Sequence, residues 1–405
     1  MRDSPSLRTQ MTTSPETRNS PRSPDAGSRS LRLMAAVAPV LCAGSAFLAP
    51  HSFWAAYLTA VVFWTGASLG CLGTTLLHRL TGGNWGWDIQ RELNAATGAL
   101  PVAILSLAPM LYGAQYVFPW AANDSAESVL NAHQQTWFAP TVLLSRLLLV
   151  IAMWCLLGRW CVVGNLRHAT GAALLPSPRY AAIGLIALWL TMTIAAIDGL
   201  MSLSPGWSSS MFGTLHAMGF SVTGLALAIV ARTVSIGSRA LSKEGADTTQ
   251  DLGSLLLAFN LLWAYFAFSE YLIIWSGDLP FEISWFVNRR HGWSLATAIG
   301  LVLLHFVVPF GCLLSRELKR DPRRLAAVAG LLLLMQLSHI AWTVFPAVPG
   351  MSPISVLFAV FSVVAIGGPW LLVFAAVHRR FPAVVTRSAM TTTAGRVAGI
   401  TGVNS

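Results

Sequence analysis

Seven ionisable side chains stand in or beside long apolar stretches of this sequence. They are Asp198, His216, Glu270, Asp278, Glu282, His305 and His339. Charge inside hydrocarbon is costly, so such groups usually have a partner or a task. Carboxylates and imidazoles can take up and release protons and can hydrogen-bond polar ligands. The pattern therefore favours a polar cavity that handles protons or a redox-active lipid.

Arg146 is an eighth such group, set inside an apolar segment. At 1.5 Å per helical residue it lies roughly 12 Å below one end of that segment. A guanidinium at this depth needs a counter-charge. Asp198 and Glu270 are the two intramembrane acids, so the sequence predicts an ion pair of Arg146 with one of them.

The histidines and cysteines give little sign of a metal or haem site. His305 and His339 differ in expected depth by several residues, which disfavours a shared b-type haem and favours ordinary buried histidines. The cysteines form neither CxxC nor CxxCH, so we expect no metal site and no covalently bound cofactor. They are Cys42, Cys71, Cys155, Cys161 and Cys312.

The elements that position these groups are apolar helices. Of the 405 residues, 55% are hydrophobic and 10% are charged, too few charges for a water-soluble surface of this size. Apolar runs of about 20 residues can each cross a bilayer. The sequence predicts an all-α polytopic membrane protein with about ten transmembrane helices. They lie near 31–48, 53–77, 95–119, 138–158, 179–201, 208–231, 251–275, 293–315, 325–345 and 353–377.

Charge predicts the orientation. Of the 26 Lys and Arg residues, only Arg289 and Arg290 lie on one side of this arrangement, and Arg146 lies within a helix. The positive-inside rule then places both termini in the cytoplasm. Residues 1–30, rich in Ser, Pro, Thr and Arg, are expected to form a disordered cytoplasmic tail, and 379–405 a second tail. Topology explains the net charge of +10, so no nucleic-acid partner is needed.

Four stretches carry a family resemblance. LTGGNWG (80–86), IDGLMSLSPGW (197–207), WAYFAFSEYLIIWSGDLPFEISWF (263–286) and HFVVPFGCLLSRELKR (305–320) follow one another along the chain. Together they resemble the F subunit of alternative complex III, a bacterial quinol:cytochrome c oxidoreductase. This subunit is similar to the NrfD-like membrane anchors of polysulfide reductase. Gly199 and Ser204 replace the family's usual Trp and acid, and Glu270 stands where Gln is frequent.

The resemblance implies an architecture and a set of partners. It implies two four-helix bundles, residues 53–201 and 202–345, with flanking helices at 31–52 and 346–378. Multi-haem and mono-haem c-type cytochromes, an iron–sulfur subunit and a paralogous NrfD-like membrane subunit would carry the haems, the clusters and the main quinol site. This chain, in the bacterial inner membrane, would contribute a quinone (menaquinone) cavity or a proton pathway and would not be catalytic alone.

A second interpretation fits the same buried charges. Ten helices with Arg146, Asp198 and Glu270 inside the membrane also suit a stand-alone ion-coupled secondary transporter. Such transporters often contain inverted repeats with helices broken at the midplane. No internal repeat is visible in the sequence, which favours the oxidoreductase subunit.

Overall fold

The computed structural model describes residues 49–122, 130–171, 177–236, 243–350 and 354–381. Within these ranges the chain is helical and contains no strand. Eight of the described helices are long and apolar enough to cross a membrane, and one bent pair adds a further span. The protein is therefore an all-α multi-pass membrane protein, as the sequence predicts. The predicted segment 31–48, the predicted tail 1–30 and residues 382–405 of the predicted tail 379–405 lie outside the described residues.

Seven of the spans are continuous helices. Several of them have proline in the first turn, where the missing N–H would have had no partner in the helix. They are α2 (Pro50–Thr81), α9 (Pro140–Ala169), α10 (Pro178–Gly199), α11 (Phe212–Ile236), α12 (Lys243–Gly277), α17 (Pro322–Val344) and α18 (Ile354–Arg380). The short helices α3 (Asn84–Asp88), α8 (Ala132–Trp137), α13 (Pro280–Val287) and α16 (Arg316–Arg320) lie in the connections.

Two spans are interrupted, each beside a proline. Helices α4 (Gln90–Gly98) and α5 (Leu100–Leu105) bend by 69° into α6 (Met110–Val117), with Pro109 at the break. Helix α14 (Gly292–Gly300) runs through a π-helical turn, η3 (Leu301–Val307), into α15 (Val308–Leu314), where Pro309 lacks the N–H that an α-helix needs. Both breaks occur beside a proline, the usual cause of a sharp kink in a helix.

The core is organised around the crossing of α2 and α11. A side-chain carbon on Gly70 would lie 1.8 Å from the carbonyl oxygen of Phe220, and one on Gly224 would lie 2.2 Å from the backbone of Gly70. The two backbones touch, which only glycine permits and which is common between membrane helices. Cys71 donates its thiol proton to the carbonyl of Gly224 at the same crossing. Most of α2 is consequently buried by protein.

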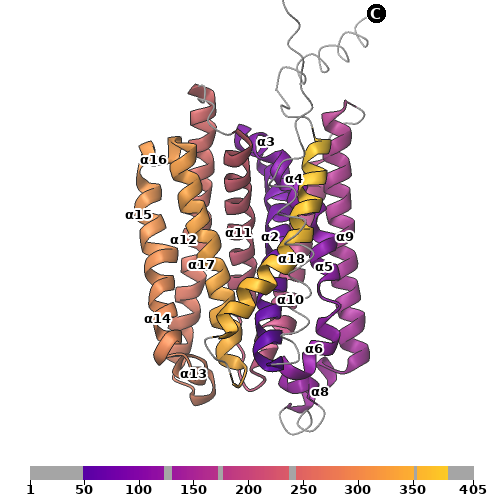
Figure 1. Cartoon of the computed structure of the whole chain (residues 1–405), viewed down its shortest axis with the longest axis vertical. Coiled ribbons are helices and arrows are strands. Elements are labelled where there is room, and N and C mark those ends of the chain that lie inside the picture. Colours follow the sequence, from indigo (N-terminus) through magenta and orange to yellow (C-terminus); the bar gives the residue numbers. More distant parts are fainter. Residues whose placement is uncertain (1–48, 123–129, 172–176, 237–242, 351–353, 382–405) are drawn as a thin grey trace, which may run out of the picture.

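The remaining helices flank this crossing (Figure 1). Helices α11, α12, α14–α15 and α17 lie on one side of the view, and α4–α6, α9 and α10 lie on the other, with α2 between them. Helix α18 runs obliquely and packs on α2 and α4. The division into bundles 53–201 and 202–345, with 346–378 as a flanking helix, stays a prediction.

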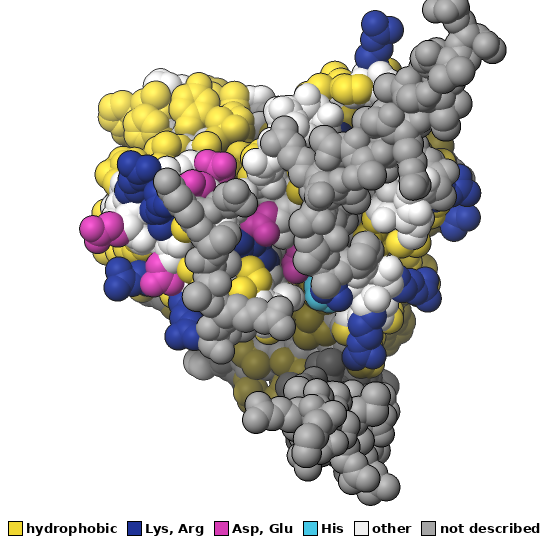
Figure 2. Space-filling view, turned by 90° about the horizontal axis from the view of Figure 1, so that it is seen from above, with side chains coloured by type: hydrophobic (Ala, Val, Ile, Leu, Met, Phe, Trp, Pro, Cys, Tyr) yellow, Lys and Arg dark blue, Asp and Glu magenta, His cyan; other side chains and the backbone are white. Residues whose placement is uncertain are grey.

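The two ends of the molecule differ in charge. Helices α3 and α16 lie at the upper end of Figure 1, and α8 and α13 lie at the lower end. Lys and Arg side chains surround the upper end (Figure 2). The exposed ones include Arg316, Arg323, Arg324, Arg379 and Arg380. By the positive-inside rule the upper end is the predicted cytoplasmic end, and we call the lower one the outer end.

Candidate functional site

Arg146 on α9 pairs with Asp198 on α10 and not with Glu270. Arg146 Nε donates to Asp198 Oδ2 at 2.7 Å, and its Nη2 donates to Oδ1 at 3.0 Å. This forked geometry is the strong form of an arginine–carboxylate pair. The side chains are 14% and 16% exposed, so the pair is mostly withdrawn from solvent.

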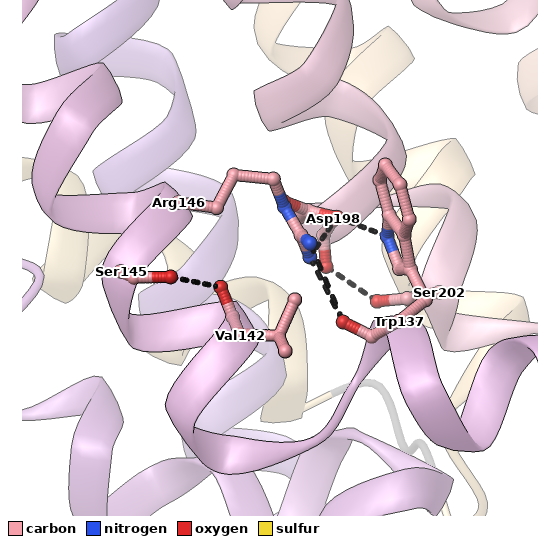
Figure 3. Close-up of polar contacts among 6 residues, drawn as sticks. All are labelled: Trp137, Val142, Ser145, Arg146, Asp198 and Ser202. Carbon is pink, nitrogen blue, oxygen red and sulfur yellow. Dashed lines mark hydrogen bonds and ion pairs between the residues drawn. The ribbon is translucent and has the colours of Figure 1, made fainter.

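Trp137, at the end of α8, completes this ion pair (Figure 3). Its indole Nε1 donates to Asp198 Oδ1 at 2.9 Å, and its carbonyl accepts from both terminal nitrogens of Arg146. Its ring also lies against the guanidinium, 4.0 Å from centroid to carbon. The Ser202 hydroxyl donates to the backbone carbonyl of Asp198. Both oxygens of the carboxylate are therefore used, and the charges are matched.

A second polar region lies among α11, α12, η3 and α17. His216 and His339 stack with ring centroids 5.1 Å apart. Trp263 contacts His339 edge-on at 5.3 Å and stacks on His305 at 3.7 Å. We call this set, His216, His339, Trp263 and His305, the histidine–tryptophan column. Its four side chains come from four helical segments, and all are buried.

Helix α17 fixes the column through residues on one of its faces. Gln336, His339 and Thr343 recur at the three- and four-residue spacing of a single helical face. The Gln336 amide donates to Nε2 of His305 at 2.8 Å, which leaves the proton of that imidazole on Nδ1. Thr343 Oγ1 lies 3.5 Å from Nε2 of His216. The rings are thus held by hydrogen bonds as well as by stacking.

Helix α12 extends the region toward the outer end. Trp263 and Glu270 are seven residues apart and share one face, roughly 10 Å apart along the axis. Glu270 is buried, and its Oε1 has no hydrogen-bond partner among the described residues. Ser209, in the α10–α11 connection, is its hydrogen-bonding neighbour, and the charge of Arg289 also acts on it. One turn from Trp263 toward the predicted cytoplasmic end, both side-chain polar atoms of Asn260 are also buried without a described partner.

Arg289 follows α13 and lies outside the spanning helices. Its Nε, Nη1 and Nη2 donate to the carbonyls of Trp342, Trp285 and Thr343 at 3.2, 3.0 and 2.9 Å. The guanidinium lies against the rings of Trp285 and Trp342, 3.2 and 5.3 Å from their centroids. Burial lowers the pKa of Arg289 to about 9, and the charge of Glu270 opposes that shift. The side chain therefore stays charged at neutral pH.

A cavity of about 290 Å³ opens beside Arg289. It is bounded by the α10–α11 connection, by α13 and by the turn after α17. Trp207 and Trp285 stack within its wall at 4.3 Å, and Phe212 contacts both rings and His216. The lining residues are Ser204, Pro205, Gly206, Trp207, Phe281, Ser284, Trp285, Asn288, Arg289, Pro346 and Ala347.

The other predicted site residues lie apart from the column. Asp278 is exposed at the end of α12 with φ of 49°, a left-handed conformation that Asp tolerates better than most residues. Glu282 is half-buried on α13, and its backbone carbonyl accepts from the indole of Trp207. Asp198 belongs to the ion pair with Arg146. The structure thus joins the three histidines, places Glu270 on the same helix face as Trp263, and separates Asp198.

The site shows no sign of a metal centre in the described ranges, where no three His, Cys, Asp or Glu side chains converge to hold an ion. Neither a protein-family model nor a curated protein sequence matches the chain. Any functional conclusion therefore depends on the geometry.

Sequence reasoning missed Arg289 and Gln336 as members of the site. Arg289 had a usable signal, because it and Arg290 are the two basic residues on a side otherwise without them. It was interpreted as a connection charge, yet it is only 3% exposed. Gln336 offered no signal beyond residue type.

Two polar contacts at the predicted cytoplasmic end were also missed. Arg232, which is buried, forms an ion pair with the half-buried Asp88, and the His378 ring lies at hydrogen-bonding distance, 3.3 Å, from Glu92 Oε1.

Proposed function

We propose that this chain is an integral membrane subunit of a quinol:electron-carrier oxidoreductase of the bacterial inner membrane. Its contribution is a proton pathway or a quinone cavity in the outer half of α11, α12, α14–α15 and α17. The partners would be the multi-haem and mono-haem c-type cytochromes, the iron–sulfur subunit and the NrfD-like paralogue that the sequence resemblance implies. The haems and iron–sulfur clusters that carry electrons would be bound by these partner subunits.

The histidine–tryptophan column is the observation that carries this proposal. Quinol oxidation releases protons with its electrons, so the membrane part of such an enzyme needs groups that accept and pass them. A neutral imidazole has one nitrogen that donates and one that accepts a hydrogen bond, so it can pass a proton between neighbours. Buried polar atoms that lack a protein partner, such as those of Asn260, usually bind water. Column and water together would form a hydrogen-bonded route through an otherwise apolar bundle.

Glu270 is the group best placed to end this route. A fixed positive charge repels an extra proton, so Arg289 disfavours an exit through its own cavity. Glu270 lies two turns nearer the outer end than Trp263 on the same face of α12, and its Oε1 is free among the described residues to accept a proton. Its hydrogen-bonding neighbour Ser209 belongs to the segment between α10 and α11 at the outer end. In this account Glu270 is the terminal relay group, and exposed Asp278 lies at the mouth.

The test is to isolate the assembly that contains the chain. A tagged full-length chain, extracted in mild detergent, should co-purify with c-type haem and an iron–sulfur protein, and the preparation should reduce an electron carrier with quinol. His339→Phe keeps ring stacking but removes proton exchange and should slow this activity at least tenfold. His51→Phe, outside the column, is the matched control. A chain that purifies without redox partners would contradict the proposal.

One observation favours the transporter as a second candidate. The bent span α4–α5/α6 is a discontinuous helix of the kind that transporters use at their binding sites. Uptake of substrate by proteoliposomes that contain only the purified chain distinguishes the two functions. Uptake driven by an ion gradient, without redox partners, would establish the transporter.

A further inference from the structure

We propose that the cavity at the outer end binds an oxyanion, a phosphate or carboxylate group, through Arg289. The inference goes beyond the proposed redox role and does not depend on it. It stands on the burial of one charge, on the chemistry of the cavity wall and on the position of the cavity.

The first argument concerns the charge of Arg289. A buried cation is costly unless an anion compensates it. Among the described residues no carboxylate lies within 4 Å of this guanidinium, whereas Arg146, Arg232, Arg320 and Arg324 each have one. Backbone carbonyls and the Trp285 ring supply only partial negative charge, and the carboxylate of Glu270 acts on Arg289 only from beyond that distance. The site is therefore built for a cation and leaves room for a full negative charge.

The second argument concerns the donors of Arg289. A guanidinium has five N–H groups in a planar fork. Three of them bond to the carbonyls of Trp285, Trp342 and Thr343, which leaves one on each terminal nitrogen. Paired donors of this kind match two oxygens of a phosphate or carboxylate. Because the carbonyls and Trp rings fix the side chain, little ordering is required when an anion binds.

The third argument concerns the rest of the cavity wall. The lining contains no acidic side chain, so nothing in it repels an anion. Ser204 and Asn288 add hydroxyl and amide groups beside Arg289. At about 290 Å³ the cavity lies at the small end of ligand pockets and suits a compact group.

The oxyanion can reach the cavity from two sources. Phe281 lines it and is also 52% exposed, and Trp275 and Leu279 beside it are exposed apolar side chains at the same end. A phospholipid of the outer leaflet could therefore place its phosphate at Arg289 and its chains along this apolar lip. A free oxyanion from the aqueous phase would use the same donors. The shared chemistry is the phosphate-like group.

The experiment uses the full-length chain and a variant that fills the cavity. Gly206 lines the cavity, and a Cβ there would meet nothing within 4 Å, so Gly206→Leu should occupy the space without disturbing the fold. Gly311→Leu, also in open space but on exposed α15, is the matched control. Arg289→Lys keeps the charge and removes the fork. Thermal melting without ligand checks that each variant is folded.

Two probes separate the sources. Sulfate is titrated into delipidated protein and followed by thermal shift, and phosphatidylglycerol is offered in nanodiscs and followed by native mass spectrometry. Binding in the wild type and in Gly311→Leu, weakened at least tenfold in Gly206→Leu and Arg289→Lys, is expected for one probe or both. Sulfate alone identifies a free oxyanion, and retained lipid identifies a headgroup. Failure of both probes, or binding unaffected by the two cavity variants, overturns the proposal.

Discussion

The pair Arg146–Asp198 and the groups Arg289 and Glu270 set the same residue types in two different states. In the first region, arginine and acid meet in a forked ion pair, and Trp137 uses the remaining hydrogen-bonding capacity. In the second, the arginine bonds to three carbonyls and the acid keeps an oxygen without a described partner. In the first region each charge has a counter-charge in contact with it, and we call this pair complete. In the second region Arg289 and Glu270 each lack such a partner among the described residues, and we call this region incomplete.

This difference separates a structural role from a functional one. A matched buried pair holds α9 and α10 together and has no capacity left for a ligand or proton. Unmatched charges cost stability and persist where they serve a function. Both regions satisfy the same sequence criterion of an ionisable group in an apolar segment, so the criterion alone cannot distinguish them. Partner geometry does.

The largest effect is expected at the complete pair. Arg146→Ala leaves Asp198 with an uncompensated charge and should lower the free energy of unfolding by about 3 kcal/mol. The double variant with Asp198→Ala should recover part of that loss, as measured by denaturation in detergent. Strictly additive losses would show that the two side chains do not interact.

Arg289 should come next. Arg289→Ala removes three hydrogen bonds to backbone carbonyls of α13 and α17, at roughly 1 kcal/mol each, and relieves the cost of a buried charge. We expect a net loss of about 2 kcal/mol in the same denaturation assay. The coupling between Arg289→Ala and Glu270→Gln should be below about 0.5 kcal/mol, because the groups are not in contact. A coupling energy as large as that between Arg146 and Asp198 would show that Arg289 and Glu270 also form a pair, and the two regions would then not differ.

The hydrogen bond from Trp137 to Asp198 can be tested separately from the ion pair. Trp137→Phe keeps an aromatic ring beside Arg146 but removes the indole donor to Asp198. The loss should be about 1 kcal/mol, the usual size for one hydrogen bond. Trp293→Phe, at a half-exposed position, is the control and should change stability little. Equal effects at the two positions would mean that the indole donor contributes nothing.

Glu270→Gln should have the smallest effect on stability. Gln keeps the shape of the side chain and can still bond to Ser209, and no ion pair is lost. The change in unfolding free energy should stay within about 0.5 kcal/mol by thermal or chemical denaturation. A loss of several kcal/mol would instead place Glu270 in a structural pair and contradict the comparison.

The sequence predicted the helices well because apolar length is a strong local signal. Segments 53–77 and 325–345 correspond to α2 and α17 with ends shifted by a few residues. Pro109 and Pro309 stand at the two interruptions, but a proline alone does not indicate that one is a 69° bend and the other a π-helical turn. Those outcomes depend on what packs against the freed backbone.

The site was only half predictable, for the same reason. Residue type and depth identified His216, His305 and His339, but no pattern in the sequence shows that Trp263 lies between two of the rings. The partner of Arg146 stayed open, since Asp198 and Glu270 had similar depth. Arg289 was misjudged because a residue in a short connection can fold inward, and only tertiary packing decides that.

Glu270, in the region with unmatched charges, should take part in proton transfer, whereas the Arg146–Asp198 pair should contribute only to the stability of the fold. The most direct measurement is quinol-oxidation turnover against pH in the intact assembly carrying Glu270→Gln, compared with the wild-type assembly. The account predicts normal subunit composition, turnover reduced severalfold and a shifted pH optimum, because Gln cannot relay a proton. Normal composition with unchanged turnover at every pH would contradict it.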